Sequence, residues 1–148
     1  MNKILFQIAP YVIILLLALY ILNTVFKKVG LKESKETKKI KKGATNIVTS
    51  KYFNPSLHKN TVLYRPLGVE MAGHYAKELR QAVNWWGTDE ALIFSTFRKL
   101  FNKMNISQVS DRYEQMYDED LRSRLINELS EYDLGLLNTI IEKLPDVN

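Results

Sequence analysis

Asn-Trp-Trp-Gly-Thr-Asp-Glu, residues 84–90, is the stretch on which the predicted fold depends. Gly87 precedes Thr88, a hydroxyl residue that can cap a helix, and two acidic residues follow. Glycine favours the end of a helix, whereas a hydroxyl cap and negative charge favour the start of the next one. We therefore predict that one helix ends here and another begins. The loop of this helix-loop-helix corner would leave backbone carbonyls pointing outward.

Amphipathic helical patterns lie on both sides of the corner. From Val69 onward, apolar residues recur at three- and four-residue intervals, as the buried face of a helix requires. The expected buried face of the second helix is Ile93, Phe94, Phe97, Leu100 and Phe101. The expected caps of the second to fifth helices are Thr88, Asn105, Asp118 or Asp120, and Ser130. Five short helices, with no strand pattern among them, predict a small all-α domain over residues 69–148.

Charge divides the chain into unlike parts. Residues 4–26 carry no charged side chain, and residues 27–42 hold eight lysines and two glutamates, a net charge of +6. Residues 69–148 hold nine basic and fourteen acidic side chains, a net charge of −5. The net charge of +5 for the whole chain therefore belongs to the segment after residue 26, and the predicted domain is acidic. The chain has no cysteine, which excludes disulfides and thiolate metal sites.

The uncharged run predicts a transmembrane anchor at residues 1–28. As a helix, the 23 residues of 4–26 span about 34 Å, which exceeds a hydrocarbon core of about 30 Å. A cleavable secretory signal is the alternative. The run is longer than the usual apolar region of a signal peptide, and no small-residue cleavage site follows it.

The lysines after the run predict the orientation of the chain and the contacts of its tether. They begin at Lys27 and Lys28 and continue into residues 29–50, a predicted basic tether. Because lysines gather on the cytoplasmic side of a span, we expect a cytoplasmic domain, with an extracytoplasmic one as the alternative. The same lysines can contact anionic lipid headgroups. A nucleic-acid partner is not expected, since no aromatic residues are interleaved with the lysines. Residues 51–68 read as a partly ordered connector that packs in part against the domain.

The predicted domain resembles a single annexin repeat. Residues 75–90 are similar to the end of the family's first helix and the loop after it, and the resemblance covers residues 69–144 once. The spacing of the family's third and fourth helices is kept by Ile106, Tyr113, Tyr117, Asp120, Leu121, Leu125, Glu128 and Leu129. Two loop positions depart from the family pattern, because Trp85 stands at its first loop glycine and Asn84 at its lysine.

The resemblance implies a calcium site at the corner. In the family, loop carbonyls and an acidic side chain of the fourth helix hold the ion, which here implies the carbonyls of Val83, Trp85 and Gly87 and the carboxylate of Glu128. The alternative needs no ligand. Residues 87–90 then serve only as the end of one helix and the cap of the next, and Glu128 pairs with Arg124 four residues earlier.

Two adjacent tryptophans in a loop cannot both point into one small core. We therefore expect Trp85 or Trp86 to be exposed, where it would enter a lipid interface or a groove of a protein partner. The alternative is that the two rings cover the helix ends.

No pattern in the sequence indicates an enzyme. His58 and His74 are the only histidines, and the chain has no nucleophile elbow, P-loop or zinc-binding His-Glu helix. We expect an integral membrane protein that binds or scaffolds a protein partner, without an obligatory cofactor. The alternative function is calcium-dependent binding of acidic phospholipid through the corner.

Overall fold

The computed structural model describes residues 20–21, 34–83 and 87–147. The chain divides into two units, residues 1–38 and 39–148. Within the described residues all regular secondary structure is helical, which confirms the predicted all-α class.

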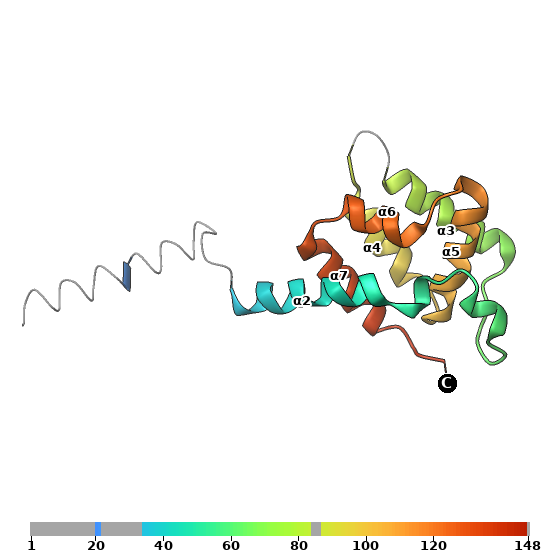
Figure 1. Ribbon diagram of the computed structural model, residues 1–148, viewed down its shortest axis with the longest axis horizontal. Helices are drawn as coiled ribbons and strands as arrows, with labels where there is room; N and C mark the ends of the chain where they lie inside the picture. Colours follow the sequence, from blue (N-terminus) through green and yellow to red (C-terminus); the bar gives the residue numbers. More distant parts are fainter. Residues whose placement is uncertain (1–19, 22–33, 84–86, 148) are drawn as a thin grey trace, which may run out of the picture. The chain divides into compact units, whose positions relative to one another are not determined.

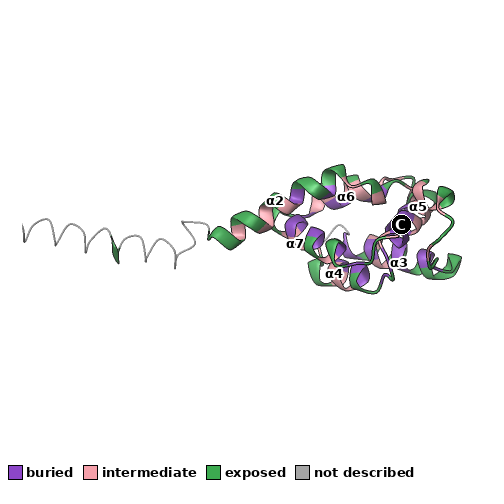
Figure 2. Ribbon diagram, turned by 90° about the horizontal axis from the view of Figure 1, so that it is seen from below, coloured by how far each residue is buried: buried purple, intermediate pink, exposed green. Residues whose placement is uncertain are grey.

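Five helices follow one another in the second unit (Figure 1). Their bounds are α3 (Val69–Ala82), α4 (Glu90–Arg98), α5 (Met104–Tyr117), α6 (Leu121–Glu128) and α7 (Glu131–Glu142). Helix α3 packs against α4 and α5, α4 packs against α7, and α5 packs against α6. Buried residues face the interior of this bundle and exposed residues face outward (Figure 2).

The helix starts agree with the predicted caps at two places and differ at two. Asp120 accepts a hydrogen bond from the backbone N–H of Ser123, and Ser130 accepts one from that of Asp133, which confirms both as caps. The prediction for Thr88 is wrong, because Asp89 caps α4 through the N–H of Leu92.

The predicted cap of the third helix, Asn105, is also wrong. It lies one residue inside α5, fully buried, and its side-chain oxygen accepts from the N–H groups of Phe101 and Asn102. Its amide nitrogen donates to the carbonyl of Arg65. Asn105 therefore organises the loop before the helix. In that loop Phe101, expected on the buried face, is 41% exposed and lies under the guanidinium of Arg65.

The hydrophobic core extends beyond the predicted boundary at residue 69. Phe53 of the short 3-10 helix η1 (Lys51–Phe53) is buried against Phe97, and Leu67 is buried as well. A second 3-10 helix, η2 (Leu57–Asn60), packs with η1 on α5. Residues 51–68 thus contribute side chains to the core, although Val62 is 92% exposed.

Part of the predicted tether is also a helix, α2 (Lys35–Thr49), with two unlike faces. Ala44 and Ile47 are buried in the core. Apolar burial therefore begins within residues 29–50. Exposed lysines follow another face of α2 at positions 35, 38, 39 and 42, the spacing of one stripe along a helix.

The predicted span at residues 4–26 lies outside the described residues except for Tyr20 and Ile21, which are helical and exposed. Among the residues that the structure does describe, we found no helix with the length and apolar character needed to cross a bilayer.

Gly135 allows α2 and α7 to approach closely. A Cβ atom at Gly135 would lie 1.9 Å from the backbone oxygen of Ile40, so one of the two helices would have to shift. We expect Gly135→Ala to lower the free energy of unfolding by about 1–3 kcal/mol, the usual cost of overpacking. Chemical denaturation of the purified chain would measure this.

The matched control for that substitution is Gly73→Ala in α3. Its added Cβ would meet nothing closer than Arg112 at 3.9 Å, an ordinary contact. Alanine in a helix interior is favoured over glycine by about 0.5–1 kcal/mol, so this variant should be slightly stabilised. Equal effects at the two positions would contradict the close approach.

Candidate functional site

The corner between α3 and α4 is closed by its own backbone. Helix α3 ends at Ala82, with Val83 as its C-cap, and the N–H of Asp89 donates to the carbonyl of Ala82 at 2.8 Å. Gly87 has φ +126°, a conformation that residues with a Cβ rarely adopt. The glycine at this position is therefore needed for the turn. Trp85 and Trp86, the predicted contact residues, lie outside the described residues, as do Lys27 and Lys28.

Two of the predicted calcium ligands converge on one side chain of α6. The guanidinium Nη2 of Arg124 donates to the carbonyl oxygen of Val83 at 2.6 Å. The same nitrogen lies 3.1 Å from Oε1 of Glu128, which confirms the predicted pair of Arg124 and Glu128. The fold thus brings together the backbone oxygen and the carboxylate that the resemblance implied, and a guanidinium lies between them.

The second carboxylate oxygen of Glu128 is also occupied. Thr88 donates its hydroxyl to Oε2 of Glu128 at 3.2 Å, across the corner from α6. Thr88 therefore links the loop to α6, in place of its predicted role as the cap of α4. Calcium at this position would have to displace the Arg124 guanidinium from both Val83 and Glu128.

These contacts continue into a line of alternating charges, which we call the corner network: Arg80, Glu119, Arg124, Glu128 and Thr88. Glu119 accepts hydrogen bonds from Arg124, at 3.5 Å, and from Arg80 of α3. Two cations thus face two carboxylates, and the network is electrically balanced.

Two tyrosines of α5 cover the α3 end of the corner network. Arg80 donates to the hydroxyl of Tyr113 at 3.4 Å, and its guanidinium lies 5.1 Å from the ring centre of Tyr117. Burial raises the pKa of Tyr113 above its ordinary value, so its phenol remains protonated at neutral pH. The tyrosines therefore shield the cation of Arg80 without adding charge.

The corner network holds the helices together and exposes no evident reacting group. Each carboxylate is hydrogen-bonded to a neighbouring cation or hydroxyl. The described residues contain no group of three or more histidine, cysteine, aspartate or glutamate side chains placed to hold a metal ion. As arranged, the site joins α3, α5 and α6 around the corner.

A second polar cluster, not anticipated from the sequence, links the connector to α5. Ser107 is fully buried, and its Oγ lies 3.0 Å from Nδ1 of His58. Asp111 lies 3.8 Å from Nε2 of the same ring and 2.9 Å from Lys59. Burial lowers the pKa of His58, and the charge of Asp111 opposes this shift only in part.

This cluster has the residue types of a hydrolase triad but not its geometry. The hydroxyl of Ser107 donates to the backbone carbonyl of Asn54 at 2.6 Å and accepts from the N–H of His58. A fully buried serine that satisfies two backbone groups is not placed to attack a substrate. Sequence offered no signal for the cluster, because 49 positions separate His58 from Ser107.

Comparison with known proteins gave no relative: no family model, curated protein or solved structure matches the chain. The resemblance to an annexin repeat therefore stays a prediction based on the residues quoted above.

Removing the Arg124 guanidinium should loosen the corner. We expect Arg124→Met to lower the free energy of unfolding by about 1–3 kcal/mol, because the carbonyl of Val83 and the carboxylate of Glu128 both lose a charged donor. Chemical denaturation measures the change. Arg98→Met is the control, since Arg98 is exposed without a described partner, and it should change the value by no more than about 0.5 kcal/mol. Equal losses in the two variants would contradict the role of Arg124.

Protonation of His58 should destabilise the fold. Its pKa is lowered on folding, so the unfolded chain binds the proton more readily, and stability falls as the pH drops below about 6.5. Glu78 and Asp146, whose pKa values are lowered as well, lose their contributions only in more acidic solution. The free energy of unfolding, measured from pH of about 7.5 to about 5.5, should show this loss. In His58→Gln the free energy of unfolding should depend less steeply on pH. An unchanged slope in the variant would refute the assignment.

Proposed function

We propose that this chain is a membrane-anchored, non-enzymatic binding or scaffold protein. Residues 4–26 form its anchor, the lysine-rich segment lies at the cytoplasmic headgroups, and the helical domain binds a protein partner there. We retain the annexin-repeat resemblance as a proposal about the ancestry of residues 69–144. In this proposal the resemblance does not imply calcium-dependent lipid binding by the domain.

The charge pattern before the domain supports the anchored part of this proposal. An uncharged run of 23 residues adjoins Lys27 and Lys28, and the exposed lysines of α2 continue the positive charge. Each lysine near an anionic surface contributes about 1 kcal/mol to membrane association. The lysines would thus complement the headgroups beside a span.

We favour a binding domain over a calcium-dependent one because of the position of Arg124. Its Nη2 lies within hydrogen-bonding distance of the carbonyl of Val83 and the carboxylate of Glu128. The positive charge that these groups attract is therefore part of the protein itself. A domain held in this way needs no ion to order its corner.

Calcium-dependent binding of acidic phospholipid is the second candidate. The convergence of Val83 and Glu128 on one point favours it, because a hard cation prefers a carbonyl and a carboxylate together. In this candidate Arg124 turns away as calcium enters, Gly87 and Trp85 add their carbonyls, and the tryptophan rings touch the bilayer.

Membrane residence is tested by alkaline extraction of membranes from cells that express the full chain with a carboxyl-terminal tag. We expect the protein to stay in the membrane pellet, because burial of an uncharged helix in the bilayer does not depend on surface charge. A variant with arginines in place of Ile13 and Leu17 should no longer be retained. Release of the unaltered chain, or removal of its first residues in the mature protein, would refute the anchor.

The two candidate functions differ in their response to calcium. Trp85 and Trp86 are the only tryptophans, so intrinsic tryptophan fluorescence of the purified chain reports directly on the corner. The binding or scaffold function predicts no saturable change on titration with calcium in the presence of phosphatidylserine. A saturable change that Glu128→Gln removes would favour the calcium-dependent function, and magnesium serves as the ionic-strength control.

A further inference from the structure

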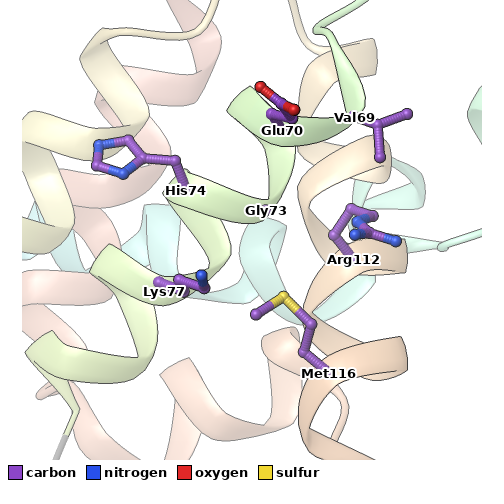
Figure 3. A pocket seen from close by; sticks show the side chains of 7 residues that line it. All are labelled: Val69, Glu70, Gly73, His74, Lys77, Arg112 and Met116. Carbon is purple, nitrogen blue, oxygen red and sulfur yellow. The ribbon is translucent and has the colours of Figure 1, made fainter.

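A groove of about 350 Å³ lies between α3 and α5, on a face that the corner network does not use. Figure 3 shows the two sides of this groove, with Glu70, Gly73 and Lys77 on α3 and Arg112 and Met116 on α5. The lining residues of α3 extend from Val69 to Lys77, about two turns of helix or roughly 12 Å. The groove is therefore long enough for several residues of an extended peptide.

Gly73 contributes no side-chain atoms to the middle of the groove. It is buried, and the nearest atoms that a Cβ there would meet are the guanidinium nitrogens Nε and Nη2 of Arg112, at 3.9 Å. Because Gly73 has no side chain, the Arg112 guanidinium lies beside the bare backbone of α3 at this position.

The cations of the groove have no acidic partner among the described residues, although the domain is acidic. Lys77 is exposed and forms no ion pair with a described residue. Arg112 donates to the neutral amide of Gln115 at 2.8 Å, and its Nε is buried without a hydrogen-bond partner. By contrast, Arg80 and Lys99 of the same domain both pair with carboxylates.

His74 also lines the groove, but its ring already has a partner. Its Nε2 lies 3.3 Å from Glu78, and Figure 3 shows the ring pointing away from Arg112. Within the described part of the chain, the positive charge of the groove that has no carboxylate partner is thus that of Lys77 and Arg112, and Met116 adds an apolar surface.

We propose that this groove binds an acidic segment of a protein partner. A carboxylate of the segment pairs with Arg112 and Lys77, an apolar neighbour lies on Met116, and a hydrogen-bond donor meets Glu70 at the other end. The planar guanidinium of Arg112 suits a carboxylate because it can donate two parallel hydrogen bonds. The inference rests on the proposed binding function and names the partner's chemistry.

A peptide fits this groove better than the surface of an anionic membrane does. Glu70 places a carboxylate at the end opposite Lys77, and a layer of lipid phosphates would be repelled there. A peptide can place an acidic residue at one end and a donor at the other. Glu70 thus determines which end of the bound peptide carries the hydrogen-bond donor and which carries the acidic residue.

The test is fluorescence anisotropy of the full chain in a neutral detergent, with a short labelled peptide of alternating glutamate and leucine. We expect saturable binding that weakens with salt, and no binding of the matching glutamine-leucine peptide. Lys77→Gln should weaken binding roughly fivefold. Arg112→Gln should weaken it roughly tenfold or more, and Arg112→Lys should fall between that variant and the unaltered chain.

Lys42→Gln is the matched control, since it removes from α2 one exposed positive charge that has no partner among the described residues, and it should leave binding unchanged. Gly73→Leu fills the groove without changing charge and should abolish binding, with circular dichroism to check that each variant is folded. Absence of binding, equal binding of both peptides, or equal loss in Lys42→Gln would overturn the proposal. Displacement of the peptide by a soluble short-chain phosphatidylserine would overturn the choice of a peptide partner.

Failure of this test and failure of the proposed function remain distinguishable. The peptide assay is performed in detergent and does not depend on the anchor, whereas alkaline extraction does not depend on the groove. If the chain stays in membranes but does not bind the acidic peptide, the proposed anchored function still holds and only the proposal for the groove is refuted.

Discussion

The bond from the Arg124 guanidinium to the carbonyl of Val83 is the constraint on which the corner depends. The last carbonyls of a helix have no partner inside it, and one at a buried end must be satisfied from elsewhere. Val83 is buried as the C-cap of α3, and α6 supplies the donor. The same guanidinium pairs with Glu128 at the end of α6 and with Glu119 just before α6. One side chain thus joins the end of α3 to both carboxylates.

This arrangement separates the structural charges of the domain from those available to a partner. Arg80, Lys99, Lys103 and Arg124 are all paired with carboxylates. Lys77 and Arg112, by contrast, line a groove and have no acidic partner in the part of the chain that the structure describes. Although the domain has more carboxylates than cations, Lys77, Arg112 and the apolar Met116 together form a locally positive surface. The corner network thus holds helices together, whereas the groove between α3 and α5 is the surface that we propose for binding a partner.

The folded unit also includes more of the chain than residues 69–144. Ala44 and Ile47 of α2 and Phe53 of η1 are buried in the same core as α3–α7. Two further contacts fix these additions. Gly135 lies directly against the backbone of Ile40, and Ser107 satisfies two backbone groups of the connector. Helix α2 therefore belongs to the domain through one face, while its lysine stripe stays exposed.

The sequence by itself predicted the helical class, the approximate positions of α3–α7 and the cap Ser130. It also narrowed the cap of α6 to Asp118 or Asp120, and it offered the pair of Arg124 with Glu128 as one of two alternatives. All of these depend on residues within one or two helical turns of each other, where periodicity and side-chain type are sufficient. It also led to two wrong caps, although Thr88 and Asn105 have side chains suited to capping. Asp89 caps α4 while Thr88 binds Glu128, and the side chain of Asn105 binds the loop before α5 and the carbonyl of Arg65. Only the tertiary structure decided that Arg124 meets Val83, that His58 meets Ser107, and that Lys77 and Arg112 face one groove. Each of these contacts joins residues more than thirty positions apart, and their approach depends on how whole helices pack, which no local pattern encodes.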